Sequence, residues 1–152
     1  MTAPMFDKIL VAVDDSPAAF AGARAAVDIA ARTGAQLRFV HVTSDGVLVH
    51  QLVSMGRDGE LATRRNKSAV SLLHHVGAEA ERAGVQAETT HLEGDPAALL
   101  LAEASNWGAD LLVIGRSGVR GTGQPYVGSV TRKVLELAEA PVLVVPRPTS
   151  AA

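Results

Sequence analysis

The residues best suited to chemistry lie in one glycine-rich segment that follows a short apolar run. The run covers residues 111–114, and the segment after it contains Gly115, Gly118, Gly121, Gly123 and Gly128. Ser129 then begins a helical pattern. Glycine lets backbone N–H groups approach an anion because it has no Cβ. The first N–H groups of a helix are unpaired donors at the positive end of its dipole. This order predicts a phosphate-binding site.

The spacing of these glycines separates the segment from two well-known phosphate loops. Gly115, two residues, Gly118, nine residues, Gly128 and Ser129 follow in order. A Walker A loop would need Gly-Lys-Ser or Gly-Lys-Thr, and the dinucleotide fingerprint would follow the first strand at a different spacing. The glycines could serve turns alone, but five of them within fourteen residues, ending at a helix start, favour a ligand.

A second candidate group stands at the end of the first predicted strand, where Asp14 follows an apolar run. A carboxylate in that place can accept hydrogen bonds from ribose hydroxyls or hold Mg²⁺ beside phosphates. Asp14 could equally be part of a helix cap, a task that Asp15 or Ser16 could perform alone. The residues leave these two roles open.

Strands and helices that alternate along the chain must position these groups. Short apolar and β-branched runs predict strands at residues 8–13, 36–42, 85–91, 111–114 and 142–145. Helical periodicity, with capping residues and glycines at several ends, predicts helices at about 17–32, 60–83, 96–107 and 129–138. Segment 43–59 is long for a connection and could hold a short helix or a mobile lid.

This alternation implies an α/β fold, a doubly wound parallel sheet of five strands with helices on both faces. Right-handed crossovers favour the strand order 3-2-1-4-5, which reverses between strands one and four. Ligands of such sheets bind beyond the carboxyl ends of the strands at that point. The loops that begin at Asp14 and Gly115 meet there. Topology and the glycine loop therefore predict the same crevice.

Composition and charge narrow the class of protein. The 152 residues are expected to form one domain at 1–148 and a short disordered tail at 149–152. A net charge of −2 without a basic run weighs against nucleic-acid binding, and the lack of cysteine excludes thiolate sites and disulfides. The sequence shows neither a signal peptide nor a segment long enough to span a membrane, so a cytoplasmic protein is expected.

Several segments, in order, resemble the universal stress protein family. They are KILVAVDDS at 8–16, FVHV at 39–42, GDPAALLLAEASNWGADLLVIG at 94–115 and APVLVVP at 140–146. The resemblance covers nearly the whole chain, and the spacing Gly-x-x-Gly-x9-Gly-Ser from Gly115 matches the family's ATP-binding branch. It implies a single-domain protein with the fold of the adenine nucleotide alpha-hydrolase-like (HUP) group.

Carried over residue by residue, the resemblance implies a set of nucleotide-binding positions. The base and ribose would lie at Ala12 and Asp14, and the adenine beside Val42. The loop side would be formed by Ile114, Gly115, Arg116 and Gly118. Phosphates would be held, and the pocket closed, by Gly128, Ser129, Val130 and Thr131. The implied ligand is ATP, with or without Mg²⁺, and cyclic AMP and AMP are alternatives.

The resemblance also implies a homodimer in which residues 142–145 pair across a two-fold axis. An exposed edge of apolar, β-branched residues agrees with this, because such an edge favours a partner strand. The C-terminal tail could mask the edge instead. Two features depart from the family: Asp15 stands where glycine is frequent, and the spacer contains Gly121, Gly123 and Pro125. Both leave the identity of the ligand open.

The candidate residues form no convincing catalytic constellation. His74 and His75 are adjacent, so on a helix they face different ways and make a poor metal pair. His41 is expected in the core or at its rim, and Ser117 lacks a nucleophile elbow. The expected function is that of a nucleotide-binding regulatory protein with an unknown protein partner in a stress response. A slow ATPase, a cyclic AMP sensor and a nucleotide-independent dimeric interaction protein are the alternatives.

Overall fold

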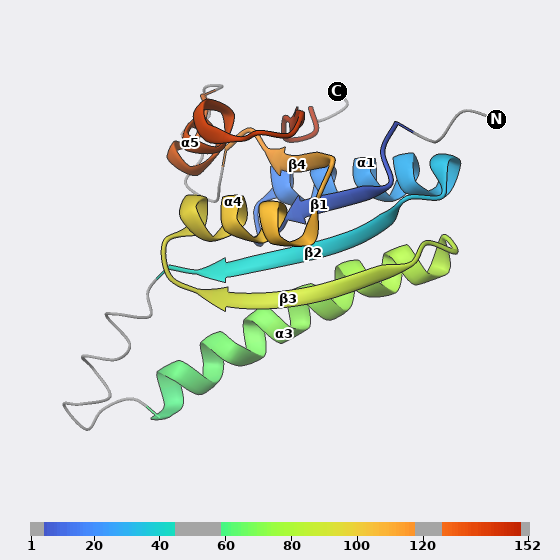
Figure 1. The fold of residues 1–152 in the computed structure, drawn as a ribbon. Coiled ribbons are helices and arrows are strands. Elements are labelled where there is room, and N and C mark those ends of the chain that lie inside the picture. Colours follow the sequence, from blue (N-terminus) through green and yellow to red (C-terminus); the bar gives the residue numbers. More distant parts are fainter. Residues whose placement is uncertain (1–4, 45–58, 118–125, 150–152) are drawn as a thin grey trace.

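The computed structural model describes residues 5–44, 59–117 and 126–149, with only the backbone of 59–66, and Figure 1 shows its elements. The strands in these residues are β1 (Lys8–Ala12), β2 (Gln36–Thr43), β3 (Ala87–Glu93), β4 (Leu111–Gly115) and β5 (Val142–Val145). The helices are α1 (Pro17–Thr33), α3 (Gly59–Arg82), α4 (Pro96–Trp107) and α5 (Ser129–Leu137). The segments expected to hold a lid or a disordered tail lie largely outside the described residues.

The strands form one parallel sheet in the order β3-β2-β1-β4-β5, which confirms the predicted α/β fold and strand order. Helices α1 and α3 cover one face, and α4 and α5 cover the other (Figure 1). The order reverses between β1 and β4, which pair from Ile9 and Leu111 to Val11 and Val113. Their carboxyl ends therefore lie side by side, as the predicted crevice requires.

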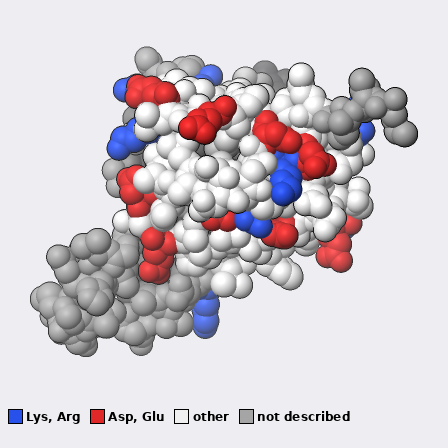
Figure 2. Space-filling view, in the orientation of Figure 1, with Lys and Arg blue, Asp and Glu red and all other residues white. Residues whose placement is uncertain are grey.

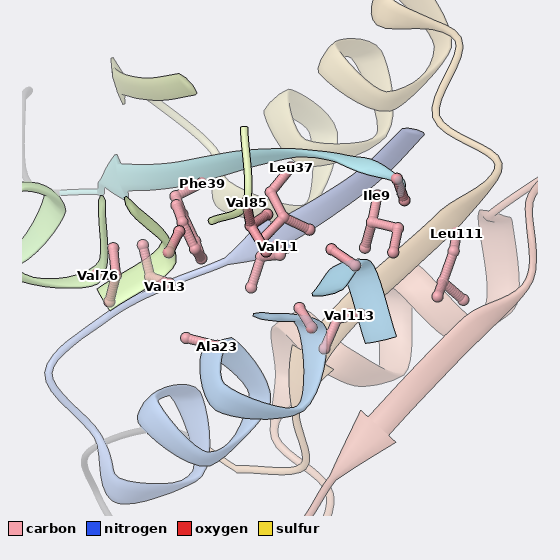
Figure 3. Packing of buried hydrophobic residues seen from close by; sticks show 14 of the residues in the cluster. Ile9, Val11, Val13, Ala23, Leu37, Phe39, Val76, Val85, Leu111 and Val113 are labelled. Atoms are coloured by element: carbon pink, nitrogen blue, oxygen red, sulfur yellow. The ribbon is translucent and has the colours of Figure 1, made fainter. Parts of the chain in front are cut away.

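Each face of the sheet carries its own hydrophobic layer, because successive strand residues point to opposite faces. On the α1–α3 face, Val11, Leu37 and Phe39 are fully buried and pack close to Ala23 of α1 (Figure 3). On the other face, Leu10, Val40 and Leu112 pack against residues of α4 and α5. The alanines of α1 allow this helix to approach the sheet closely, so the layer is well filled despite few aromatic residues.

Most helix ends lie where the capping residues predicted them. The Oγ of Ser16 accepts a hydrogen bond from Ala19 N–H at 3.1 Å, and Oδ2 of Asp95 accepts one from Ala98 N–H at 2.9 Å. Gly34 ends α1 with φ +80°. The third strand differs, since β3 covers Ala87–Glu93 instead of 85–91. Val85 N–H donates to the carbonyl of Ala80 at 2.9 Å, so this residue completes the end of α3.

Charged groups are interspersed on the face shown in Figure 2, with uncharged surface between them. Within the described part of this face there is no continuous basic patch, in line with the net charge of −2. Arg38 of β2 forms ion pairs of 2.7 Å with Glu88 of β3 and Glu103 of α4 and lies 4.6 Å from the ring centre of Trp107. The contacts with Glu103 and Trp107 link α4 to the sheet, and the ion pair with Glu88 links β2 to β3. None of the described helices is both long and apolar enough to cross a membrane.

Candidate functional site

A cavity of about 750 Å³ lies at the carboxyl ends of the central strands, where the strand order reverses. Its wall comes from the end of β1 and the turn after it, from β2, from the starts of α1, α4 and α5, and from the end of β4. The volume is in the range of small-molecule sites.

A second cavity of about 510 Å³ lies between the ends of α4 and α5, near the amino ends of β4 and β5, and none of the predicted site residues lines it.

The structure places most of the predicted site residues in the wall of the larger cavity. These are Ala12, Asp14, Val42, Ile114, Gly115, Gly128, Ser129, Val130 and Thr131. Arg116 does not line it, and its backbone instead joins neighbouring segments: its N–H donates to Val145 at 2.8 Å and its carbonyl accepts from Gly128 at 2.8 Å. Gly118 lies outside the described residues, as do Gly121, Gly123 and Pro125 of the spacer.

Sequence reasoning missed several further wall residues. They are Val13, Ser16, Ala19, Val40, Ser44, Pro96, Leu100, Ser117 and Tyr126. Alternation along β2 could have identified Val40, which is two residues before Val42 and therefore on the same face. Pro96 and Leu100 belong to the first turns of α4. The periodicity of this segment predicts a helix that faces the core, without indicating which of its residues reach the cavity. Their place in the wall depends on how α4 crosses the sheet, which a local pattern does not encode.

Asp14 has one carboxylate oxygen committed to the turn after β1. Its Oδ1 accepts a hydrogen bond from Ser16 N–H at 2.8 Å, and Ser16 in turn caps α1. Asp14 is partly buried and lines the cavity. The structure thus shows the turn-forming role. A carboxylate has about four lone-pair sites, so this bond leaves acceptor capacity for a ligand hydroxyl.

The amino end of α5 also faces the cavity, and it differs from those of α1 and α4. Its N-cap is Gly128, and no side chain among the described residues caps it, whereas Ser16 and Asp95 cap the other two helices. The backbone N–H groups of the first turn, together with the exposed hydroxyl of Ser129, are therefore available to an anion. Such an end favours a negatively charged group.

Two of the expected phosphate donors have other partners in the structure. The N–H of Gly128 donates to the carbonyl of Arg116 at 2.8 Å, so it is already engaged. The hydroxyl of Thr131 donates to the carbonyl of Gly115 at 2.7 Å, and Thr131 is buried. These bonds fasten the start of α5 to the end of β4. They hold the N–H groups of Ser129 and Val130 in position. The N–H of Gly128 and the hydroxyl of Thr131 are themselves less available to a phosphate, because each already has an acceptor in the protein.

Gly115 brings β4 close to the first turn of α1. A Cβ built on this residue would lie 2.9 Å from the carbonyl carbon and Cβ of Ala18 and from the nitrogen of Ala19. Real Cβ atoms do not approach other atoms that closely, so the contact requires glycine. The residue therefore serves the packing of the cavity wall, in addition to any contact with a ligand.

Acidic and histidine side chains in the described residues form no group of three or more that could hold a metal ion. Asp14 is the one carboxylate among the described residues of the cavity wall. The chemistry of the wall is therefore that of a largely apolar pocket that also contains a carboxylate and the N–H donors of a helix amino end. It suits a ligand that combines an apolar part with an anionic group.

Comparison with known proteins gives matches over nearly the whole chain. The model of the Universal stress protein family matches residues 5–146. The Universal stress protein YxiE of Bacillus subtilis is 33% identical over 147 residues, which cover 93% of this chain and 99% of that protein. The solved structure of the protein MJ0577 has a TM-score of 0.83 at 23% identity and covers 96% of this chain and 99% of that one.

Two further solved structures contain nucleotides. One is a universal stress protein in complex with cAMP, with a TM-score of 0.68 at 23% identity, covering 94% of this chain and 98% of that one. The other is the universal stress protein from Archaeoglobus fulgidus in complex with dAMP, with a TM-score of 0.67 at 24% identity, covering 93% and 98%. At these identities the likeness concerns the fold.

Proposed function

The chain belongs to the universal stress protein family, and from this premise we propose that its cavity binds an adenine nucleotide, with ATP as the leading candidate. One observation carries the proposal: an uncapped helix amino end meets an apolar pocket at the point where the strand order reverses. A nucleotide needs both of these environments, since its base is flat and largely apolar and its phosphates are anionic.

The apolar half of the cavity suits the base. Val40 and Val42 of β2, Leu100 of α4 and Ile114 of β4 come together in its wall. Val40, Leu100 and Ile114 are buried, so this part of the wall is a preformed surface. Asp14, on the turn after β1, would accept from the ribose hydroxyls through the lone pairs that its bond to Ser16 leaves free.

The polar half suits the phosphates. Backbone N–H groups at the start of α5 and the hydroxyl of Ser129 would donate to phosphate oxygens. The bonds from Thr131 to Gly115 and from Gly128 to Arg116 would hold these donors in place before a ligand arrives. Preorganisation of this kind lowers the entropic cost of binding. When Mg²⁺ is present, it would neutralise phosphate charge beside Asp14.

The related structures that contain cAMP and dAMP support an adenine nucleotide as the ligand class. They leave ATP, AMP and cyclic AMP as alternatives for this chain. Binding is favoured over hydrolysis because Asp14 is the one carboxylate among the described wall residues and is assigned to the ribose hydroxyls, and those described residues include no histidine. The proposed role is a regulatory module in a stress response whose surface depends on nucleotide occupancy. A cytoplasmic location and an unidentified protein partner stay predictions.

The proposal is tested by calorimetric titration of nucleotide-stripped protein with ATP, AMP and cyclic AMP, each with and without Mg²⁺. We expect saturable binding of an adenine nucleotide at one site per chain, and little binding of GTP at equal concentration. A preference for cyclic AMP would make the protein a second-messenger sensor. Steady phosphate release above that of a Ser129→Ala control would favour the slow ATPase. No binding of any adenine nucleotide would contradict the proposal and favour a nucleotide-independent interaction module.

We further propose a homodimer that forms through β5, the edge strand beside β4. Its residues are partly buried, and the neighbouring helix α5 exposes Leu135 and Leu137, at 49% and 64%. An edge with unpaired backbone groups beside exposed apolar side chains favours association with a second copy.

Val144→Lys is expected to shift the protein from dimer to monomer, because two lysines would face each other across the two-fold axis. The measurement is the mass in solution by light scattering over a dilution series. Val70→Lys is a control for an added lysine away from β5, since Val70 is 62% exposed on α3, which packs on β2 and β3. An unchanged mass for a folded Val144→Lys protein would refute the placement of the interface.

A further inference from the structure

His41 lies next to the cavity without being part of its wall. It stands on β2 between Val40 and Val42, which both line the cavity. Because side chains alternate along a strand, His41 points to the other face of the sheet, toward the layer that contains Phe39. Its ring is partly buried there, and Nδ1 lies 2.8 Å from the carbonyl oxygen of Val13.

The carbonyl of Val13 is the first one beyond the backbone ladder of β1. The paired residues of β1 and β2 end with Ala12 and Val40. Beyond them, the N–H of Val13 donates one more hydrogen bond to the carbonyl of Val40, at 2.9 Å. The next acceptor, Val13 O, receives a side-chain donor from His41. A carbonyl oxygen can accept but not donate, so Nδ1 must carry the proton in this arrangement.

This bond acts on the turn that lines the cavity. The carbonyl of Val13 and the nitrogen of Asp14 belong to one planar peptide group, so a donor that holds the carbonyl also sets the direction in which Asp14 leaves the strand. Asp14 then accepts from Ser16 N–H at 2.8 Å. The side chain of Val13 is itself anchored in the α1–α3 layer, where Figure 3 shows it.

His91 supports the ring of His41 from the neighbouring strand. The two residues are register partners on β2 and β3, and their rings stack with centres 5.6 Å apart and planes 25° apart. Nε2 of His91 lies 2.7 Å from the hydroxyl of Thr43. The ring of His41 thus has a fixed neighbour on the side away from Val13, which limits its rotation.

We propose that His41 is a positioning residue of the nucleotide site. Its Nδ1–H group holds the carbonyl of Val13 and thereby sets the place of Asp14 at the cavity. The inference rests on the proposed function and deepens it, because it assigns a role to a side chain outside the wall. The contact that matters is the hydrogen bond to Val13, and the stacked ring serves to keep it aligned.

Two substitutions separate the hydrogen bond from the ring. His41→Phe keeps a ring against His91 but removes the donor, and it should weaken adenine-nucleotide binding about tenfold, the value of one hydrogen bond. His41→Asn removes the ring but places an N–H donor close to the position of Nδ1, and it should bind within about twofold of the parent. A merely structural ring would give the opposite ranking, which would overturn the proposal.

His91→Phe is the matched control, because it preserves a stacked ring and leaves the bond from His41 to Val13 intact. Nucleotide affinity close to that of the parent is expected for this variant. Melting temperatures are recorded for all three variants, so that affinities are compared between folded proteins. Equal losses of affinity for His41→Asn and His41→Phe would also overturn the proposal.

Amide hydrogen exchange in the ligand-free protein tests the same inference without a nucleotide. In His41→Phe, the amide of Ser16 should exchange at least about tenfold faster, while that of Val11 in the middle of β1 stays at its parental rate. His41→Asn should restore the slow exchange of Ser16. If the parent binds no nucleotide, the proposed function fails, and this measurement still decides the role of His41. Unchanged exchange at Ser16 in both variants would reject it.

Discussion

Gly115→Ala is expected to lower the free energy of unfolding by about 3 kcal/mol, the range of overpacked cores. The new Cβ would lie 2.9 Å from the carbonyl carbon of Ala18 and from the nitrogen of Ala19. Both are backbone atoms in the first turn of α1, so no change of side-chain rotamer can relieve the contact. Either β4 or the start of the helix must move, and both are parts of the cavity wall.

Thermal unfolding measures this effect. For a chain of this size, 1 kcal/mol corresponds to about 2–4 °C, so Tm should fall by about 6–12 °C. Nucleotide affinity should fall as well, because the carbonyl of Gly115 accepts from Thr131 at 2.7 Å and so couples β4 to the start of α5. The affinity is measured well below the new Tm, so that unfolding does not contribute.

Gly22→Ala is the matched control, because it places the same methyl group between the same two elements. A Cβ at Gly22 would lie 3.5 Å from Cγ1 of Val113, an ordinary van der Waals distance. Alanine is favoured over glycine within a helix by up to about 1 kcal/mol. This variant should therefore be neutral or slightly more stable. Equal destabilisation by both substitutions would mean that α1 and β4 do not approach most closely at Gly115.

The fold could be predicted because its signals are local or depend on chirality. Ser16 and Asp95, each followed by proline, mark helix starts, and their side-chain bonds in the structure agree with this. Gly34 and Gly108 adopt the left-handed conformation that ends helices. Right-handed crossovers then leave few strand orders. The position of the crevice follows from that order alone.

The partners of individual polar groups could not be predicted in the same way. The type of a residue says what it can donate or accept, but not which neighbour reaches it first. The N–H of Gly128 was expected to face a phosphate, yet it donates to the carbonyl of Arg116, the residue that follows β4. Val85 is apolar and β-branched like a strand residue, yet its N–H completes the end of α3. The first bond joins residues on either side of the segment between β4 and α5, and the second is a local bond of the turn that closes α3.

Gly128→Val is expected to weaken ATP binding about a hundredfold or more while the fold stays largely intact. Gly128 has φ −66° and ψ 158°, values that valine adopts readily, and its bond to Arg116 uses backbone atoms that the substitution keeps. The added side chain would occupy the space at the start of α5 where the phosphates are proposed to lie. Loss of two charge-assisted hydrogen bonds corresponds to at least this factor.

Calorimetric titration of Gly128→Val with ATP measures the loss of affinity. Two further variants are compared with it to separate the effect of added bulk from that of a lost hydroxyl. Gly128→Ala adds one methyl group and should cost less affinity than valine. Ser129→Ala removes one hydroxyl without adding bulk and should cost about tenfold or less. Valine is also a poorer N-cap than glycine, so a stability loss of about 1 kcal/mol is expected and is measured separately.

The sharpest control for Gly128→Val is adenosine, which has the base and ribose of ATP but no phosphate. Because Val40 and Val42 belong to β2 and Asp14 to the turn after β1, and none of them to α5, adenosine should bind the variant within about threefold of the parent while ATP loses most of its affinity. Equal losses for both ligands would indicate that valine distorts the whole pocket. Undiminished ATP binding would mean that the start of α5 does not meet the phosphates, and the phosphate end of the site would then have to be sought elsewhere in the cavity.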